Sequence, residues 1–167
     1  MRFENRGGNL ERLIVAAMSD FAADWRSARQ RQEKMSADGL ITLRSSNGPE
    51  ETMNRFEAEV RKRGLTIFAH VDHAAGAAAA GLPLRSTELL VFGNARGGTP
   101  LMQADQTIGI DLPLKALAWK DASGKTWLSY NDAVWLAARH GITGHGAQVA
   151  AALTSAVAGL AKDAAGA

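Results

Sequence analysis

The sequence contains no cysteine among its 167 residues. Disulfides, thiolate metal sites, iron–sulfur clusters and thiol nucleophiles are therefore excluded together. Histidine, present at four positions, is then the side chain to consider first as a metal or cofactor ligand.

Long hydrophobic runs are also missing. No apolar stretch approaches the roughly 18 residues that a membrane span requires. The N-terminal residues are polar, and the apolar segment from Leu13 to Met18 is soon interrupted by Asp20, so it is too short for a signal sequence. We therefore expect no membrane partner and a cytoplasmic location, or a periplasmic one only if an export signal was removed.

An excess of one charge sign is lacking as well. Lysine and arginine number 19 against 17 acidic residues, so the surface is nearly balanced. The tight basic cluster from Arg61 to Arg63 is typical of the solvated end of a helix. We therefore expect no nucleic-acid partner.

Alternating helical and extended patterns predict a single α+β domain with a mixed or antiparallel sheet packed against several helices. Leu10, Ile14 and Phe21 belong to an apolar stripe that predicts an N-terminal helical extension over residues 9–34. Beyond it the predicted order is β-α-β-α-β-α-β-β-α-α. A hairpin at residues 120–124 would bring Trp119 close to Trp127. The last helix is expected over residues 147–162.

A glycine-rich turn after the strand that ends at Phe92 organises this order. Thr99 followed by Pro100 is the pattern of a helix cap with proline in the first turn, which predicts a short helix from Pro100. The β-branched residues that follow favour a long strand over residues 108–119.

Four blocks resemble one family: VDHAAGAAAAGLPL, LLVFGNARGGTPLMQ, IGIDLPLKALAW and SYNDAVWLAARHG. Together they are similar to DUF302, a bacterial and archaeal domain of unknown function. The family usually has proline where this chain has Ala95 and Ala133. The resemblance implies a small α+β domain that forms homodimers, and it implies no established activity. We divide the chain into an extension (1–37), the DUF302-like domain (38–142) and an alanine-rich helix packed on the same domain (143–167).

His73 is the first candidate ligand. Asp72 is expected to cap a helix that starts at His73, and the positive end of the helix dipole favours a neutral imidazole, the form that a metal or haem iron binds. His70 precedes it on a strand, and the two histidines do not share one metal by simple spacing. The alternative is that His73 only bonds a loop carbonyl.

Small residues around Ala77 leave room beside His73 for a flat apolar cofactor, with haem as the sharpest version. Its walls would come from Phe92, Met102 and Trp119, and Met102 could be a second axial ligand. The alternative is that the protein's own sheet or a partner helix fills this room and that Met102 packs in the core.

A second candidate site lies in the glycine turn. Arg96 and the backbone N–H groups at Gly97, Gly98 and Thr99 could receive a carboxylate or phosphate. No phosphate-binding fingerprint is present, so a turn without a ligand is the alternative.

Three hypotheses follow. The first is a non-catalytic, homodimeric module that binds a small ligand or cofactor. The second is an enzyme of unknown reaction acting on a small anionic substrate at the Arg96 turn, with Asp72 or His73 as base. The third is a docking protein that works through its N-terminal helix. No nucleophile motif or acid–base pair is recognisable, so no catalytic residue is assigned.

Overall fold

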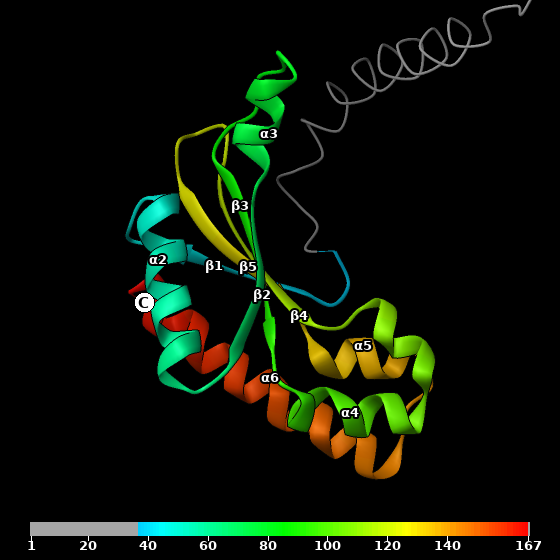
Figure 1. Cartoon of the computed structure of the whole chain (residues 1–167). Helices are drawn as coiled ribbons and strands as arrows, with labels where there is room; N and C mark the ends of the chain where they lie inside the picture. The colour runs from blue at the N-terminus through cyan, green and yellow to red at the C-terminus, as the bar shows by residue number, and fades with distance from the viewer. Residues whose placement is uncertain (1–36, 167) are drawn as a thin grey trace, which may run out of the picture. The chain divides into compact units, whose positions relative to one another are not determined.

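The computed structural model describes residues 37–166 (Figure 1). Ten of the eleven elements in these residues follow the predicted order, and the 3-10 helix η1 is additional. The five strands are β1 (Leu40–Ser45), β2 (Thr66–Asp72), β3 (Thr87–Gly93), β4 (Leu114–Lys120) and β5 (Thr126–Asn131). The helices are α2 (Pro49–Lys62), α3 (His73–Ala79), α4 (Ala95–Ala104), the 3-10 helix η1 (Gln106–Ile110), α5 (Ala133–Arg139) and α6 (Gly144–Ala165). The N-terminal extension expected at 1–37 falls almost wholly outside the described residues.

The strands form one sheet in the order β1-β5-β4-β3-β2, and each neighbouring pair is antiparallel. The sheet is therefore antiparallel, which narrows the mixed-or-antiparallel expectation. The hairpin between β4 and β5 pairs Trp119 with Trp127 as predicted, and the structure shows that their rings stack at 6.2 Å between centroids. β1 and β2 are the two edge strands.

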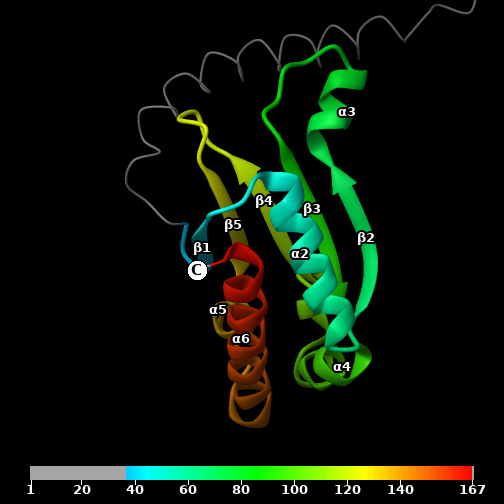
Figure 2. The same cartoon turned by 90° about the vertical axis from the view of Figure 1, so that its left-hand side faces the viewer.

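Helices α2 and α6 cover one face of the sheet (Figure 2). The apolar side chains of α2 recur at helical spacing, and Met53, Phe56 and Val60 are fully buried. The Phe56 ring meets Phe92 of β3 edge to face at 5.1 Å between centroids. Val157 and Leu160 of α6 complete the same core.

A second cluster lies where α4, η1 and α5 meet the first half of α6. Leu101, Ile108, Leu136 and Ala150 are among its buried members. Helix α3 lies at the other end of the β2–β3 pair, away from α4 and α5 (Figure 1). Its N-cap is Asp72, which accepts from the Ala75 N–H at 2.8 Å as predicted.

Two expectations near the glycine turn were wrong. Helix α4 begins at Ala95, because the Asn94 side chain caps it, and Pro100 lies inside the helix. The segment expected as a strand from residue 108 begins as η1, whose N-cap Asp105 accepts from the Thr107 N–H at 2.7 Å. The strand itself starts only at Leu114, after a cis peptide bond between Leu112 and Pro113.

Candidate functional site

An apolar cavity of about 310 Å³ lies between β3, α4 and α6, and we call it the α4–α6 cavity. Its volume is at the lower end of the range for small-molecule sites. It is lined by Leu65, Phe68, Phe92, Gly93, Asn94, Ala95, Gly97, Gly98, Thr99, Met102, Gly109, Leu112, Pro113, Leu114, Leu153, Ala156, Val157 and Leu160.

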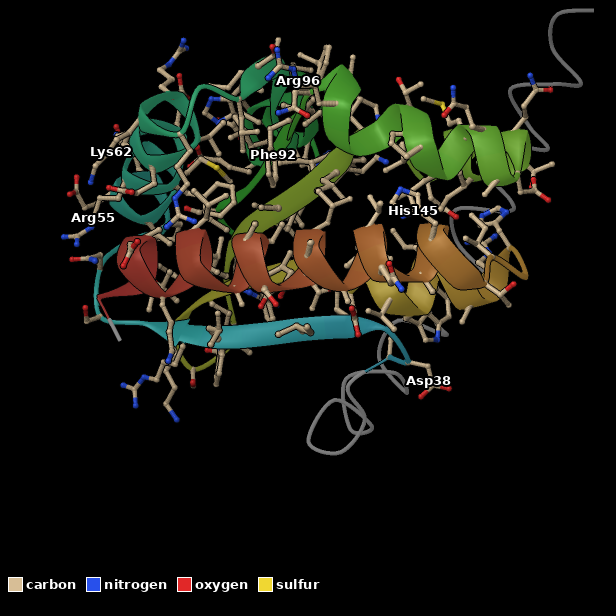
Figure 3. All side chains as sticks on the ribbon, turned by 90° about the horizontal axis from the view of Figure 1, so that it is seen from below. Asp38, Arg55, Lys62, Phe92, Arg96 and His145 are labelled. Atoms are coloured by element: carbon tan, nitrogen blue, oxygen red, sulfur yellow. The ribbon has the colours of Figure 1, made fainter. Side chains whose placement is uncertain are left out.

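The sheet supplies one wall through Phe92, which alternation along β3 points to the helix-covered face. Figure 3 shows Phe92 between α2, α4 and α6, with Arg96 at the outer side of this space. Phe68 of β2 also lines the cavity, although 57% of its surface is exposed. The wall therefore runs from a fully buried ring to an exposed one.

The first turns of α4 form the second wall. Asn94 accepts from the Gly97 N–H through its side chain at 2.8 Å and from the Gly98 N–H through its carbonyl at 3.1 Å. Gly97 allows this wall to lie close to α6, because a Cβ at position 97 would come within 3.0 Å of Leu153 Cδ2. The close approach of α4 to α6 thus depends on Gly97.

Helix α6 forms the third wall. Leu153, Val157 and Leu160 recur at steps of three and four residues, so they share one face of the helix. Ala156 lies beside them and contributes only a methyl group. The small side chain leaves space at the rim that a larger one would fill.

The cavity is electrically neutral, because no acidic, basic or histidine side chain is among its lining residues. Burial and Asp132 raise the pKa of Tyr130, and hydrogen bonds from Thr107 lower the pKa of Asp105, but neither residue lines the cavity. The surroundings suit an uncharged apolar molecule, since a charge buried there would lack a partner.

The structure brings two separately predicted sites together. Phe92 and Met102 were expected to wall a flat cofactor, and Gly97, Gly98 and Thr99 were expected to receive an anion. All five line the same cavity. Arg96 does not line it, and the Gly97 and Gly98 N–H groups are already hydrogen-bonded within the chain. This geometry favours apolar contact over anion binding.

The other predicted ligand residues lie elsewhere. His73 is exposed at the start of α3, a helix without a buried residue, and Ala77 follows on the same helix. His73 lies six residues along the strand from Ile67, the partner of Phe92, which corresponds to roughly 20 Å. Trp119 stacks on Trp127 and donates from Nε1 to the Ser129 hydroxyl at 2.8 Å. None of the three lines the cavity.

His70 is occupied by acidic neighbours. Its Nε2 lies 3.1 Å from Glu88 Oε2, and its Nδ1 lies 3.7 Å from Glu57 Oε2 on α2. Within residues 37–166 no group of three or more histidine or acidic residues is placed to hold a metal ion. The metal role predicted for His70 and His73 stays a prediction.

A separate polar cluster joins η1 to α5. His140 Nε2 lies 2.7 Å from Asp111 Oδ2, and its Nδ1 lies 2.8 Å from the Thr107 hydroxyl. Arg139 also donates to Asp111 at 3.2 Å. These residues do not line the cavity, and they connect two elements of the second apolar cluster.

Sequence reasoning missed Phe68 and the whole α6 wall. The alanine and leucine residues of α6 predicted a helix, but they did not show which elements its apolar face packs against. The sequence did not indicate that Phe68 lines the cavity, because ordinary alternation along β2 places Phe68 and Ile67 on opposite faces of the sheet. The bulge that changes this is visible only in the pairing with β3.

Comparison with known proteins identifies a family and a fold. The family profile described as "Domain of unknown function DUF302" matches residues 41–160. A solved structure described as "uncharacterized conserved protein DUF302 from Bacillus stearothermophilus" superposes with a TM-score of 0.69 at 18% identity, and it covers 77% of this chain and 99% of that chain. At this identity the likeness shows the fold alone.

Curated relatives are longer than the shared region. "Fluoride-specific ion channel FluC 1" of Brucella suis biovar 1 is 52% identical over 104 residues, which are 62% of this chain and 41% of that protein. The protein of the same name from Brucella abortus biovar 1 is also 52% identical over 104 residues, which are 38% of its length. The match therefore spans about two fifths of each relative. Residues 37–166 contain no helix with the length and hydropathy needed to cross a bilayer.

Proposed function

The chain belongs to the DUF302 family, a domain of unknown function, and we propose that it binds a small, uncharged and largely apolar molecule in the α4–α6 cavity. The single observation that carries this proposal is a cavity of about 310 Å³ whose lining has no ionisable side chain. Desolvating an apolar ligand there is favourable, whereas a charged group would lose its hydration without a partner.

The polar groups of the lining are few. Asn94 and Thr99 are exposed residues at the α4 side, and they are the two lining residues with polar side chains. A ligand with one hydroxyl, ester or amide group could place it there while its apolar part contacts Phe92 and Met102. The proposal thus specifies an apolar body with at most one uncharged polar end.

A fluorescence titration tests this function. The neutral probe N-phenyl-1-naphthylamine brightens when it enters an apolar site, and we expect saturable brightening with the full chain. Ala156→Trp should weaken binding about tenfold or more, equivalent to at least about 1.4 kcal/mol, because the indole fills the rim. Ala151→Trp is the control, since Ala151 is an exposed alanine of the same helix that does not line the cavity. Equal affinity in both variants, or no saturable signal, would overturn the proposal.

Haem does not fit the residues around His73. A haem needs apolar walls on both faces of the porphyrin beside its axial ligand, whereas α3 has no buried residue and lies apart from Phe92 and Met102. Adding haem to the purified protein and recording its absorbance tests the cofactor expectation directly. A Soret band that is lost in His73→Ala would support haem as the ligand, whereas no Soret band, or one unchanged in His73→Ala, would refute it.

A homodimer, which the family resemblance implies, remains our proposal for the assembly. Sedimentation equilibrium of the full chain measures it. We expect a mass of twice the chain at micromolar concentration, and a monomer throughout would refute it.

The names of the curated relatives favour a second function, in which the chain is an accessory domain of an ion channel. Those proteins are named fluoride-specific ion channels. The match spans about two fifths of each relative, so we propose that the chain acts as an accessory domain to a separate channel.

Fluoride efflux from vesicles tests the accessory role. The Brucella suis relative would be reconstituted with its 104-residue matching region removed, and efflux would be followed with a fluoride electrode. Adding the present chain should change the efflux rate in a saturable way. An unchanged rate across the whole concentration range would eliminate this second function.

A further inference from the structure

Phe68 lies on the edge strand β2 at a point where the pairing with β3 is irregular. Ile67 pairs with Phe92 and Ala69 pairs with Val91, so two neighbouring residues of β3 face three residues of β2. Phe68 is the extra residue and has no partner in the β3 register. A bulge of this kind interrupts the alternation of side chains and redirects one of them.

The redirection brings Phe68 to the cavity. Ile67 lies on the helix-covered face with Phe92, and regular alternation would send Phe68 to the opposite face. Phe68 instead lines the α4–α6 cavity together with Phe92. The bulge therefore places two consecutive side chains of β2, Ile67 and Phe68, on the helix-covered face, where Ile67 packs against the core and Phe68 lines the cavity.

The Phe68 ring is held on one side only. It is 57% exposed, while Phe92 is fully buried. β2 is an edge strand, so no further strand of the described sheet lies beyond it. The ring can change rotamer without disturbing the core, whereas Phe92 cannot.

We propose that Phe68 forms the adjustable wall at the mouth of the α4–α6 cavity and sets which neutral apolar ligands are retained, by size. The inference rests on the proposed function. A cavity of about 310 Å³ corresponds to about ten times the volume that one water occupies in the liquid, so it encloses roughly ten non-hydrogen atoms. Longer ligands extend past Phe68, whose ring then covers the emerging part of the molecule.

Straight-chain alcohols from hexanol to dodecanol supply a graded test, because they share one hydroxyl and differ only in length. Their affinities are read from displacement of N-phenyl-1-naphthylamine, and probe release is followed by stopped flow. For the unaltered protein we expect affinity to rise with chain length and then to level off when the cavity is full.

Phe68→Ala should accelerate probe release about tenfold, because the covering ring is gone. It should also shift the levelling point to longer alcohols, because the removed ring leaves more room to fill at the mouth of the cavity. Phe68→Trp should slow release and shift the levelling point to shorter alcohols. Val71→Ala is the matched control: Val71 is a 38%-exposed residue of the same strand that does not line the cavity, and its replacement should change neither quantity.

The outcomes separate the two proposals. If both Phe68 variants release the probe and rank the alcohols as the unaltered protein does, while Ala156→Trp still weakens binding, the role of Phe68 is refuted and the proposed function stands. If the unaltered protein binds neither the probe nor any alcohol, the proposed function is refuted and the Phe68 inference falls with it.

Discussion

Gly97 and Gly98 are adjacent in α4, yet the two positions meet different surroundings. A Cβ at position 98 would lie 3.7 Å from Leu112 Cδ1 and 3.8 Å from Met102 Cε, which are ordinary contact distances. A Cβ at position 97 would lie 3.0 Å from Leu153 Cδ2 and 3.3 Å from Asn94 Oδ1, which is too close without a shift. One glycine therefore keeps space open for the cavity, and the other permits contact between helices.

We predict opposite effects from two single alanine substitutions. Gly98→Ala should raise the free energy of unfolding by about 0.5–1 kcal/mol, because alanine loses less backbone entropy in a helix. The same methyl group should reduce probe affinity, since it occupies cavity volume. Gly97→Ala should lower stability, because its methyl group presses on Leu153. Urea denaturation and probe titration of both variants give the comparison, and equal behaviour of the two would contradict it.

Asp121 makes the β4–β5 hairpin sensitive to acid. The Trp127 indole N–H donates to Oδ2 at 2.8 Å, and the Ser123 hydroxyl donates to Oδ1 at 2.7 Å. These hydrogen bonds, with Trp127 first, hold the pKa of Asp121 far below its usual value of 3.8. The unfolded chain therefore binds the proton more readily than the folded chain does.

It follows that the stability supplied by Asp121 is fully present above about pH 4, near the unfolded pKa, and declines as the pH falls toward the lowered folded pKa. Asp121→Asn should reduce the melting temperature at neutral pH and flatten its fall between about pH 4 and 2. Trp127 fluorescence reports the local change. Asp38→Asn, at an exposed position near the start of the described chain, is the control. If the melting temperature of Asp121→Asn falls with pH as steeply as that of the unaltered protein, other acidic residues determine the acid sensitivity.

The cap of α3 was predictable from its residues, whereas the start of α4 was not. Asp72 is the single capping residue directly before the run of small residues that forms α3, so the start of this helix was unambiguous. Before α4 the chain offers two caps, Asn94 and Thr99 followed by Pro100. The structure uses Asn94, because its side chain reaches the Gly97 N–H and Gly97 allows the first turn of α4 to lie close to Leu153. A choice between two local signals depends on tertiary packing, here against Leu153.

The same limit explains η1. Ile108 and Ile110 favour a strand by propensity, but Asp105 captures the Thr107 N–H and begins a 3-10 turn. Ile108 is then buried in the second cluster while Ile110 is 78% exposed, a difference that β propensity does not foresee. Long-range bonds from α5 hold the turn, and no local pattern reveals them.

We predict that His140 is the main polar link between η1 and α5. His140→Ala removes its hydrogen bonds to Asp111 and Thr107, and it should cost about 1–3 kcal/mol of unfolding free energy because a carboxylate loses a partner. Hydrogen exchange should quicken in η1 more than in β4. His145→Ala, at an exposed position in the first turn of α6, should change stability by less than about 0.5 kcal/mol. Equal losses in both variants would refute the link.

At the scale of the whole molecule, the alternation of patterns predicted the element order, whereas the pairing partners came only from the structure. Apart from the additional 3-10 helix η1, the expected order holds from β1 to α6 within residues 37–166. Which strands become edges depends on contacts between distant segments, such as β1 with β5. The cavity is a product of that topology, since it joins β3, α4 and α6 across some 70 residues of sequence.

The chain divides into two units after Met35, and the DUF302 match begins at residue 41. The α4–α6 cavity is lined entirely by residues of the second unit. We therefore predict that a variant lacking residues 1–36 keeps the melting temperature and the probe affinity of the full chain, as calorimetry and fluorescence titration would show. If residues 1–36 serve docking, the same variant should lose self-association or the effect on fluoride efflux while it still binds the probe. Loss of probe binding in this variant would contradict the assignment of the ligand site to the second unit, because its walls would then depend on residues outside it.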